Sequence, residues 1–210
     1  MKSEDLCKKS VSVESILKNV VKDKKLLDDV YSGAHSGKAE IKFKCGKVLR
    51  TLSEEKPEII YPNWDFFIDL LDSDNTFIKA IALAIVANLT RVDSKNKFDS
   101  IFNKYYALLD DKSMITAANI AGYSGIIAIA KPKLQTKVTN KLIGIDKTHH
   151  SLECKNIIKG KAILTFNEYF EKTKNKKKII DFVKKQLKCE SPKTRKLARE
   201  FLNKWEKERS

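Results

Sequence analysis

Cysteine is scarce in this sequence and never occurs in a paired spacing. The 210 residues contain four cysteines, Cys7, Cys45, Cys154 and Cys189, and no C-x-x-C motif. A small disulfide-stabilised domain would need closely spaced pairs of this kind. We therefore expect reduced thiols in an intracellular protein.

Recognisable catalytic motifs are also absent. The sequence has no phosphate-binding loop, no nucleophile elbow and no H-E-x-x-H helix. His149, His150 and Cys154 have the spacing of metal ligands, but a zinc site normally needs four ligands and no second cluster accompanies them. We interpret the histidines as part of a helix cap. We expect a non-enzymatic protein with no catalytic residue, no cofactor and no metal.

Long uncharged runs are limited to one segment. Residues 113–130 carry no charge over 18 positions, close to the length of about 20 residues that a membrane-spanning helix needs. Thr116, Asn119 and Ser124 dilute the hydrophobicity of this segment, which favours a central helix buried on all sides. The N-terminal lysines precede no apolar run, which argues against a secretory signal peptide. We expect no membrane contact and a cytoplasmic location.

Helical periodicity is abundant, and no segment reads as a strand. Phe98, Phe102, Tyr105 and Leu109 recur at spacings of three and four residues, which places one apolar stripe on a helix. Pro62 is expected to open a helix that runs to Leu71, because proline is tolerated in a first turn. The other predicted helices cover residues 13–21, 26–31, 41–52, 77–89, 98–109, 113–130, 133–144, 152–170, 176–187 and 193–205.

A helix-start pattern recurs five times along the chain. It lies at Ile41-Lys42, Ile78-Lys79, Ile115-Thr116, Cys154-Lys155 and Thr194-Arg195, at spacings of 37, 37, 39 and 40 residues. A period in this range means that each unit is a helix pair too small to bury its own apolar face, so stacked neighbours share a core. We predict a single domain, residues 1–210, with an N-terminal cap over 1–21. The predicted repeats cover about 22–54, 57–92, 94–131, 133–173 and 175–209.

The repeats resemble HEAT repeats. In that family, the second helix of a pair typically begins after an acidic turn with an apolar residue, then a basic residue, then small residues. Residues 71–82 and 190–198 resemble this pattern most closely, with Asp74 five positions before Lys79. The resemblance implies an all-α fold, a right-handed α-α superhelix of about five HEAT-like helix pairs with an N-terminal capping helix. It implies little about chemistry.

Two interpretations of the repeated basic position stay open. In the structural one, Lys42, Lys79, Lys155 and Arg195 satisfy carboxylates and carbonyls in the turns of their own or adjacent units. In the functional one, they project together toward an anionic ligand. We favour the structural interpretation, because helix-start bases paired with turn acids recur in solenoids for packing reasons.

Positive charge is concentrated at the C-terminal end. The net charge is +15, and residues 151–210 carry 18 basic and 8 acidic side chains, whereas residues 51–150 carry 12 of each. Such an excess attracts polyanions. Only five of the basic residues are arginines, and lysine is a solvated point charge rather than a bidentate phosphate ligand. We therefore predict an acidic protein or peptide as the partner, with nucleic acid as the alternative.

The nucleic-acid alternative has a second basis. The chain resembles the HEAT-like alkylpurine DNA glycosylases in size and in its all-helical architecture, and that resemblance implies tryptophans and an aspartate facing a damaged nucleotide. The tryptophans here are Trp64, beside Asp65, and Trp205, and both fall in apolar stripes. We predict that both are packed in the core.

These observations favour an interaction scaffold that binds an acidic partner through its concave and C-terminal basic surface. In this hypothesis the second helices of the pairs line the concave face. The predicted partner-binding residues are Lys42, Lys79, Lys155, Lys193, Arg195, Lys196 and Arg199.

Overall fold

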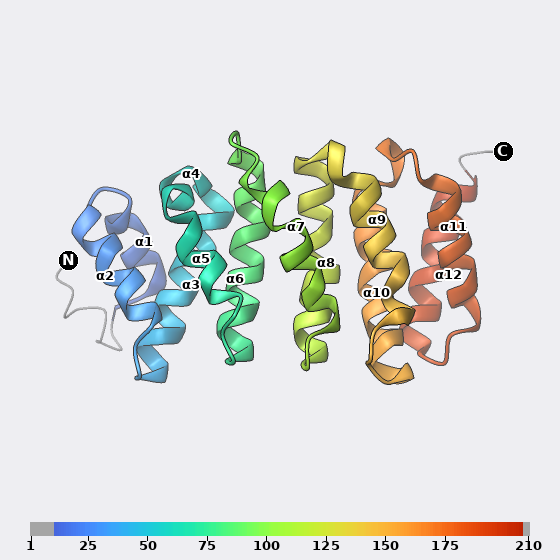
Figure 1. Ribbon diagram of the computed structural model, residues 1–210, viewed down its shortest axis with the longest axis horizontal. Helices are drawn as coiled ribbons and strands as arrows, with labels where there is room; N and C mark the ends of the chain where they lie inside the picture. Colours follow the sequence, from blue (N-terminus) through green and yellow to red (C-terminus); the bar gives the residue numbers. More distant parts are fainter. Residues whose placement is uncertain (1–10, 208–210) are drawn as a thin grey trace. The chain divides into compact units, whose positions relative to one another are not determined.

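The computed structural model describes residues 11–207, with side chains up to Trp205. Within this range the chain forms α-helices and short 3-10 helices and no strand (Figure 1). The prediction of an all-α protein is therefore confirmed. Cys7, the lysines before residue 10 and Arg209 lie outside the described residues, as do the first half of the predicted cap and the end of the last predicted repeat.

The helices follow the predicted segments closely. Each of the five recurring motifs lies in the first turns of a helix, namely α3, α6, α8, α10 or α12. The helices are α1 Val13–Val20, α2 Lys24–Ala34, α3 Ala39–Glu55, α4 Pro57–Ile60, α5 Trp64–Leu70, α6 Thr76–Leu89, α7 Lys97–Ala107, α8 Met114–Ala130, α9 Gln135–Ile143, α10 Leu152–Tyr169, α11 Lys176–Lys185 and α12 Pro192–Lys207.

One predicted helix is wrong in detail. The segment expected to begin at Pro62 starts in a 3-10 turn over Tyr61–Asn63 and continues as α5, and the short helix α4 that precedes it was not predicted. Pro57 is the proline in the first turn, at the start of α4. Pro62 lies in the 3-10 turn, because a proline inside an α-helix lacks the N–H that would continue the hydrogen-bond ladder.

The chain forms two compact units, residues 1–92 and 93–210. In the first unit α3 packs against α1, α2 and α6, and α5 packs against α6. Trp64 and Phe67 of α5 are buried in its core. Asn88 Nδ2 donates to Ser53 Oγ at 2.9 Å, and Arg91 donates to the Ser53 carbonyl oxygen, which joins the ends of α6 and α3.

In the second unit α10 lies between α8 and α12 and contacts both (Figure 1). α9 packs against α8, and α11 packs against α12. These neighbours explain why α8 carries no charge: it is covered by α9 and α10, and Ala117, Ile120, Ala121 and Ile127 are fully buried. Among residues 11–207, no helix has the length and apolar character needed to cross a bilayer.

Several hydrogen bonds between successive helix pairs span 38 residues. In the second unit Thr194 Oγ1 donates to the Asn156 carbonyl oxygen and Trp205 Nε1 donates to Asn167 Oδ1, both at 2.8 Å and across 38 residues. In the first unit the bond from Arg91 to Ser53 also spans 38 residues. This separation matches the 37 to 40 residues between the recurring motifs.

Gly160 lets α10 and α12 approach closely. A Cβ atom at position 160 would lie 2.8 Å from Thr194 Oγ1, which is closer than real Cβ contacts. The hydroxyl of Thr194 uses this space to reach the Asn156 carbonyl oxygen. The small residue therefore sets the spacing of the two helices that form the candidate site.

Candidate partner-binding groove

Serine caps hold the starts of the two helices that form the candidate site. Ser151 is the N-cap of α10, and its hydroxyl accepts from the Cys154 N–H at 3.3 Å. The Ser191 hydroxyl accepts from the Thr194 N–H at the start of α12, also at 3.3 Å. The prediction that His149 and His150 cap α10 is therefore wrong, because the capping oxygen belongs to the serine that follows them.

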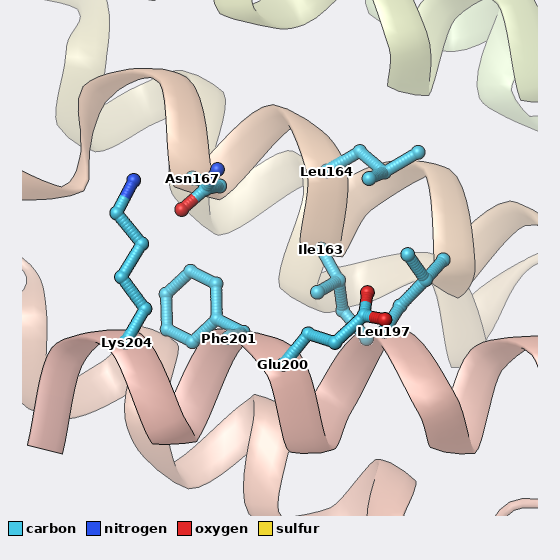
Figure 2. A pocket seen from close by; sticks show the side chains of 7 residues that line it. All are labelled: Ile163, Leu164, Asn167, Leu197, Glu200, Phe201 and Lys204. Carbon is cyan, nitrogen blue, oxygen red and sulfur yellow. The ribbon is translucent and has the colours of Figure 1, made fainter.

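A shallow groove runs between α10 and α12. One hollow, of about 120 Å³, lies between Ile163, Leu164 and Asn167 on α10 and Leu197, Glu200, Phe201 and Lys204 on α12 (Figure 2). A second, of about 60 Å³, is lined by Ile157, Gly160, Lys161 and Leu164 together with Ser191, Lys193, Thr194 and Leu197. Leu164 and Leu197 line both hollows, so the two form one α10–α12 groove. Small-molecule pockets usually measure about 300 to 1,000 Å³, so this groove suits single side chains of another protein.

The groove presents large apolar side chains to solvent. Ile157 and Leu164 are 42 % and 43 % exposed, although both lie on a helix whose buried stripe is already complete. They are seven residues apart, which places them on the same face of α10. Clustered exposed aliphatic residues mark interaction surfaces more often than they mark an incidental surface.

Lysines border the apolar residues. Lys161 stands between Ile157 and Leu164 on α10, and Lys193 and Lys204 lie near the two ends of the groove on α12. In Figure 2 the ammonium of Lys204 extends toward the Asn167 side chain of α10. The acidic side chain that lines the groove is Glu200, which lies 3.8 Å from the Lys196 ammonium.

The predicted partner-binding residues fall into two groups. Lys193, Lys196 and Arg199 are exposed on α12, and Lys193 lines the groove. The other predicted residues occupy the repeated basic position and are less accessible. Lys42 in the first unit and Lys155 in the second are half-buried.

Two residues of the repeated position do not present their charge as predicted. Lys79 is buried, at 7 % exposure, and interacts within the protein. Arg195 Nη1 donates to the carbonyl oxygens of Cys189 and Glu190, at 2.6 and 2.9 Å. The guanidinium thus holds the turn before α12, which is the contact that the structural interpretation expects.

Sequence reasoning missed the groove residues on α10. Ile158, Ala162, Ile163 and Phe166 form the buried stripe of this helix. Ile157 and Leu164 lie outside that stripe, so α10 has more apolar residues than its packing requires. That excess is the signal that could have identified the groove.

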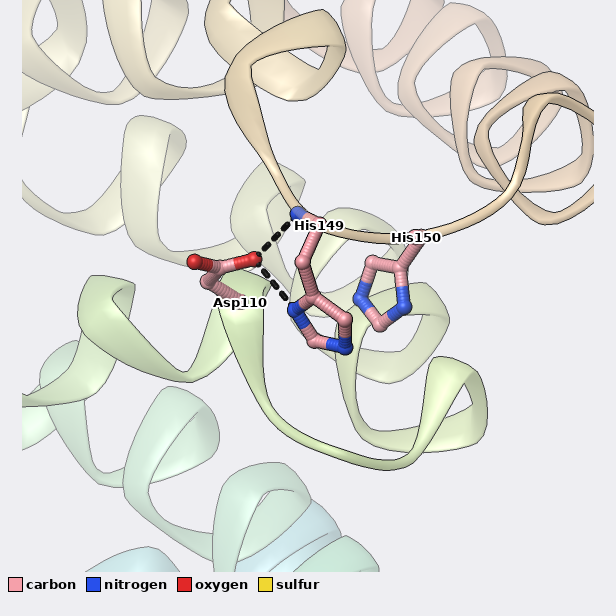
Figure 3. A group of neighbouring side chains, drawn as sticks. All are labelled: Asp110, His149 and His150. Atoms are coloured by element: carbon pink, nitrogen blue, oxygen red, sulfur yellow. Dashed lines mark hydrogen bonds and ion pairs between the residues drawn. The ribbon is translucent and has the colours of Figure 1, made fainter.

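Apart from the groove, a cluster of polar side chains lies in the turn before α10. Both the backbone N–H and the ring Nδ1 of His149 lie 2.7 Å from Asp110 Oδ1, and His150 Nε2 lies 3.1 Å from the Leu109 carbonyl oxygen (Figure 3). The pKa of Asp110 is lowered. The main cause is the hydrogen bond from the His149 backbone N–H, and the second is the hydrogen bond with the His149 side chain. In the part of the chain that the structure describes, no other group of three His, Cys, Asp or Glu side chains is arranged so that it could hold a metal ion.

Several tyrosines of the second unit are buried in its core. Burial raises the pKa of Tyr105, Tyr106 and Tyr169. Tyr106 donates to Ser124 Oγ at 3.0 Å, and the Tyr169 hydroxyl lies 2.9 Å from Thr139 Oγ1, so these phenols form hydrogen bonds inside the core.

No protein-family model matches the chain, and no curated protein matches it significantly.

Proposed function

We propose that this protein is a non-enzymatic interaction scaffold that binds an acidic, amphipathic helix of a partner protein in the α10–α12 groove. The observation that carries the proposal is the arrangement of Ile157, Leu164 and Leu197 among Lys161, Lys193 and Lys204. An apolar floor with a basic border fits a helix that has leucine-like residues on one face and carboxylates beside them.

The dimensions of the groove suit a short helix. Lys193 and Lys204 are eleven positions apart on α12, which corresponds to about 16 Å at the helical rise of 1.5 Å per residue. A partner helix of three turns covers this length. Its apolar residues would lie on Leu164 and Leu197, and acidic residues near its ends would reach the two lysines.

The proposal includes the predicted repeat architecture, in which about five HEAT-like helix pairs and an N-terminal cap form a right-handed superhelix. Hydrogen bonds that span 38 residues support it, since they join the second helices of neighbouring pairs at nearly corresponding positions. In such an array the second helices of the pairs form a continuous binding face. A cytoplasmic location is also part of the proposal, and cell fractionation tests it.

Selection from a random peptide library tests the proposed partner chemistry. The full-length protein is immobilised and presented with displayed 16-residue peptides of random sequence. We expect the selected peptides to combine Leu, Ile or Phe at helical spacing with an excess of Asp and Glu. Peptides without acidic enrichment, or the absence of any enriched peptide, would contradict the proposal.

Nucleic acid is the second candidate partner, and the exposed lysines at 172, 174, 177 and 178 favour it. Trp64 and Trp205 are buried, at 2 % and 9 % exposure, and offer no stacking platform of the kind that the glycosylase resemblance implies. Titration of labelled duplex DNA, single-stranded DNA and RNA at two salt concentrations tests this candidate. Submicromolar binding near physiological salt that a Lys193→Glu/Lys196→Glu/Arg199→Glu variant loses would favour nucleic acid over a protein partner.

A further inference from the structure

Three side chains of the kinds that ligate transition metals converge at the turn before α10. Asp110 ends the 3-10 turn Leu108–Asp110, and His149 and His150 precede the N-cap of α10. Each offers one ligand atom, and the three atoms lie within 4.8 Å of one another (Figure 3). The carboxylate and the histidines are 39 residues apart in sequence, so the fold brings them together.

The backbone preorganises this cluster. The His149 N–H donates to Asp110 Oδ1 at 2.7 Å, which fixes the carboxylate beside the histidine turn whatever the His149 ring does. His150 is buried, at 6 % exposure, and its ring donates through Nε2 to the Leu109 carbonyl oxygen, because a carbonyl oxygen only accepts. Histidine ligands of metals commonly donate one ring N–H to a carbonyl or a carboxylate in this way.

The donor set suits zinc. Two imidazoles and one carboxylate are a common set for Zn²⁺ when a water molecule completes the coordination. Ligands about 2.1 Å from a tetrahedral ion lie about 3.4 Å from one another. The cluster must therefore rearrange slightly, since the His149 Nδ1 and Asp110 Oδ1 atoms are 2.7 Å apart and would move away from each other to hold the same ion. The His149 and Asp110 side chains are 54 % and 56 % exposed and have room to make this movement.

We propose that Asp110, His149 and His150 bind one Zn²⁺ ion. Each imidazole binds through the lone pair of one nitrogen and keeps its single hydrogen on the other. His150 therefore binds through Nδ1 and keeps its hydrogen bond from Nε2 to the Leu109 carbonyl oxygen. Bound zinc would join the turn after α7 to the turn before α10 and stabilise the second unit. Lys141 and Lys147, which line a hollow beside Asp110, oppose this binding by their positive charge.

Isothermal titration of the full-length protein with Zn²⁺, together with Co²⁺ absorption spectroscopy, tests the proposal. The protein must carry no polyhistidine tag. We expect one saturable ion per chain, and we expect His149→Gln and Asp110→Asn each to weaken binding by about tenfold or more. His35→Gln is the matched control, because His35 is exposed and is the remaining histidine of the sequence. Cys154→Ser should also leave binding unchanged.

Thermal unfolding in excess EDTA and in excess Zn²⁺ separates metal binding from a purely structural role. Zinc should raise the melting temperature of the wild type, of His35→Gln and of Cys154→Ser, and should not raise that of His149→Gln. The proposal is overturned if the wild type binds no saturable ion. It is also overturned if zinc affects the His149→Gln and Asp110→Asn variants as it affects the wild type, which would leave the cluster as a set of hydrogen bonds.

Discussion

At the scale of single residues, the side chains at the repeated basic position differ in how much of each is buried and in what it contacts. Lys79 is buried, Lys42 and Lys155 are half-buried, and the Arg195 guanidinium is bonded to two carbonyl oxygens. A basic residue at a helix start can therefore satisfy the preceding turn instead of a ligand. The lysines that border the groove, Lys161, Lys193 and Lys204, lie outside this position and are exposed.

Arg195→Ala should destabilise the second unit, because it removes the donor for the Cys189 and Glu190 carbonyl oxygens. Two lost hydrogen bonds from a charged, partly buried group correspond to about 1 to 2 kcal/mol. Lys196→Ala, one position later and exposed, is the control and should change the free energy of unfolding by no more than about 0.5 kcal/mol. Urea unfolding followed by circular dichroism and by tryptophan fluorescence measures both. Equal stabilities of the two variants would contradict the assigned role of Arg195.

At the scale of secondary-structure elements, the sequence was a good guide to where helices lie. Apolar spacing and capping residues are local signals, and they identified the segments that became α6, α8, α10 and α12. The 3-10 turn at Pro62 and the short helix α4 before it were missed, because a proline in the first turn of an α-helix and a proline in a 3-10 turn look alike in sequence. The Ser151 cap was missed because the capping role was assigned to His149 and His150, which directly precede it.

The two faces of α10 should separate stability from binding. Leu164→Ser removes an exposed side chain, so we expect a stability change within about 1 kcal/mol and a clear loss of affinity for a selected peptide. Phe166→Ala empties a fully buried site and should cost about 3 to 5 kcal/mol. Peptide anisotropy and urea unfolding of both variants check this. A Leu164→Ser variant that binds like the wild type would argue against the groove.

At the scale of the whole molecule, the spacing of the recurring motifs matches the sequence separation of several hydrogen-bonded residues. Motifs recur every 37 to 40 residues, and side chains bond to groups 38 residues away in both units. The groove was missed because the face of α10 that stays uncovered depends on how the neighbouring helices pack, although the surplus of apolar residues on α10 pointed to it. Of the Asp110 cluster, the sequence indicated His149 and His150 but not Asp110, because a whole repeat separates Asp110 from the histidines.

The lysines that border the groove should strengthen the binding of an acidic peptide by local attraction, in addition to the effect of the net charge. Peptide affinity should fall as salt rises, since exposed charges are screened within about 10 Å at 0.1 M salt. An apolar contribution should persist at high salt, because Leu164 and Leu197 do not depend on screening. Affinity measured at several salt concentrations checks both parts. Affinity that is insensitive to salt would contradict the role of the lysines.

The most direct test of the central claim compares two triple charge reversals with equal effects on net charge. Lys161→Glu/Lys193→Glu/Lys204→Glu changes the groove, whereas Lys133→Glu/Lys137→Glu/Lys141→Glu changes exposed lysines at and before α9. The Kd of each for a selected acidic peptide is measured by fluorescence anisotropy. We expect the groove variant to bind about tenfold to a hundredfold more weakly, because like charges then meet at the groove, and we expect the α9 variant to stay near wild type. Equal losses in the two variants, or no loss in the groove variant, would contradict it.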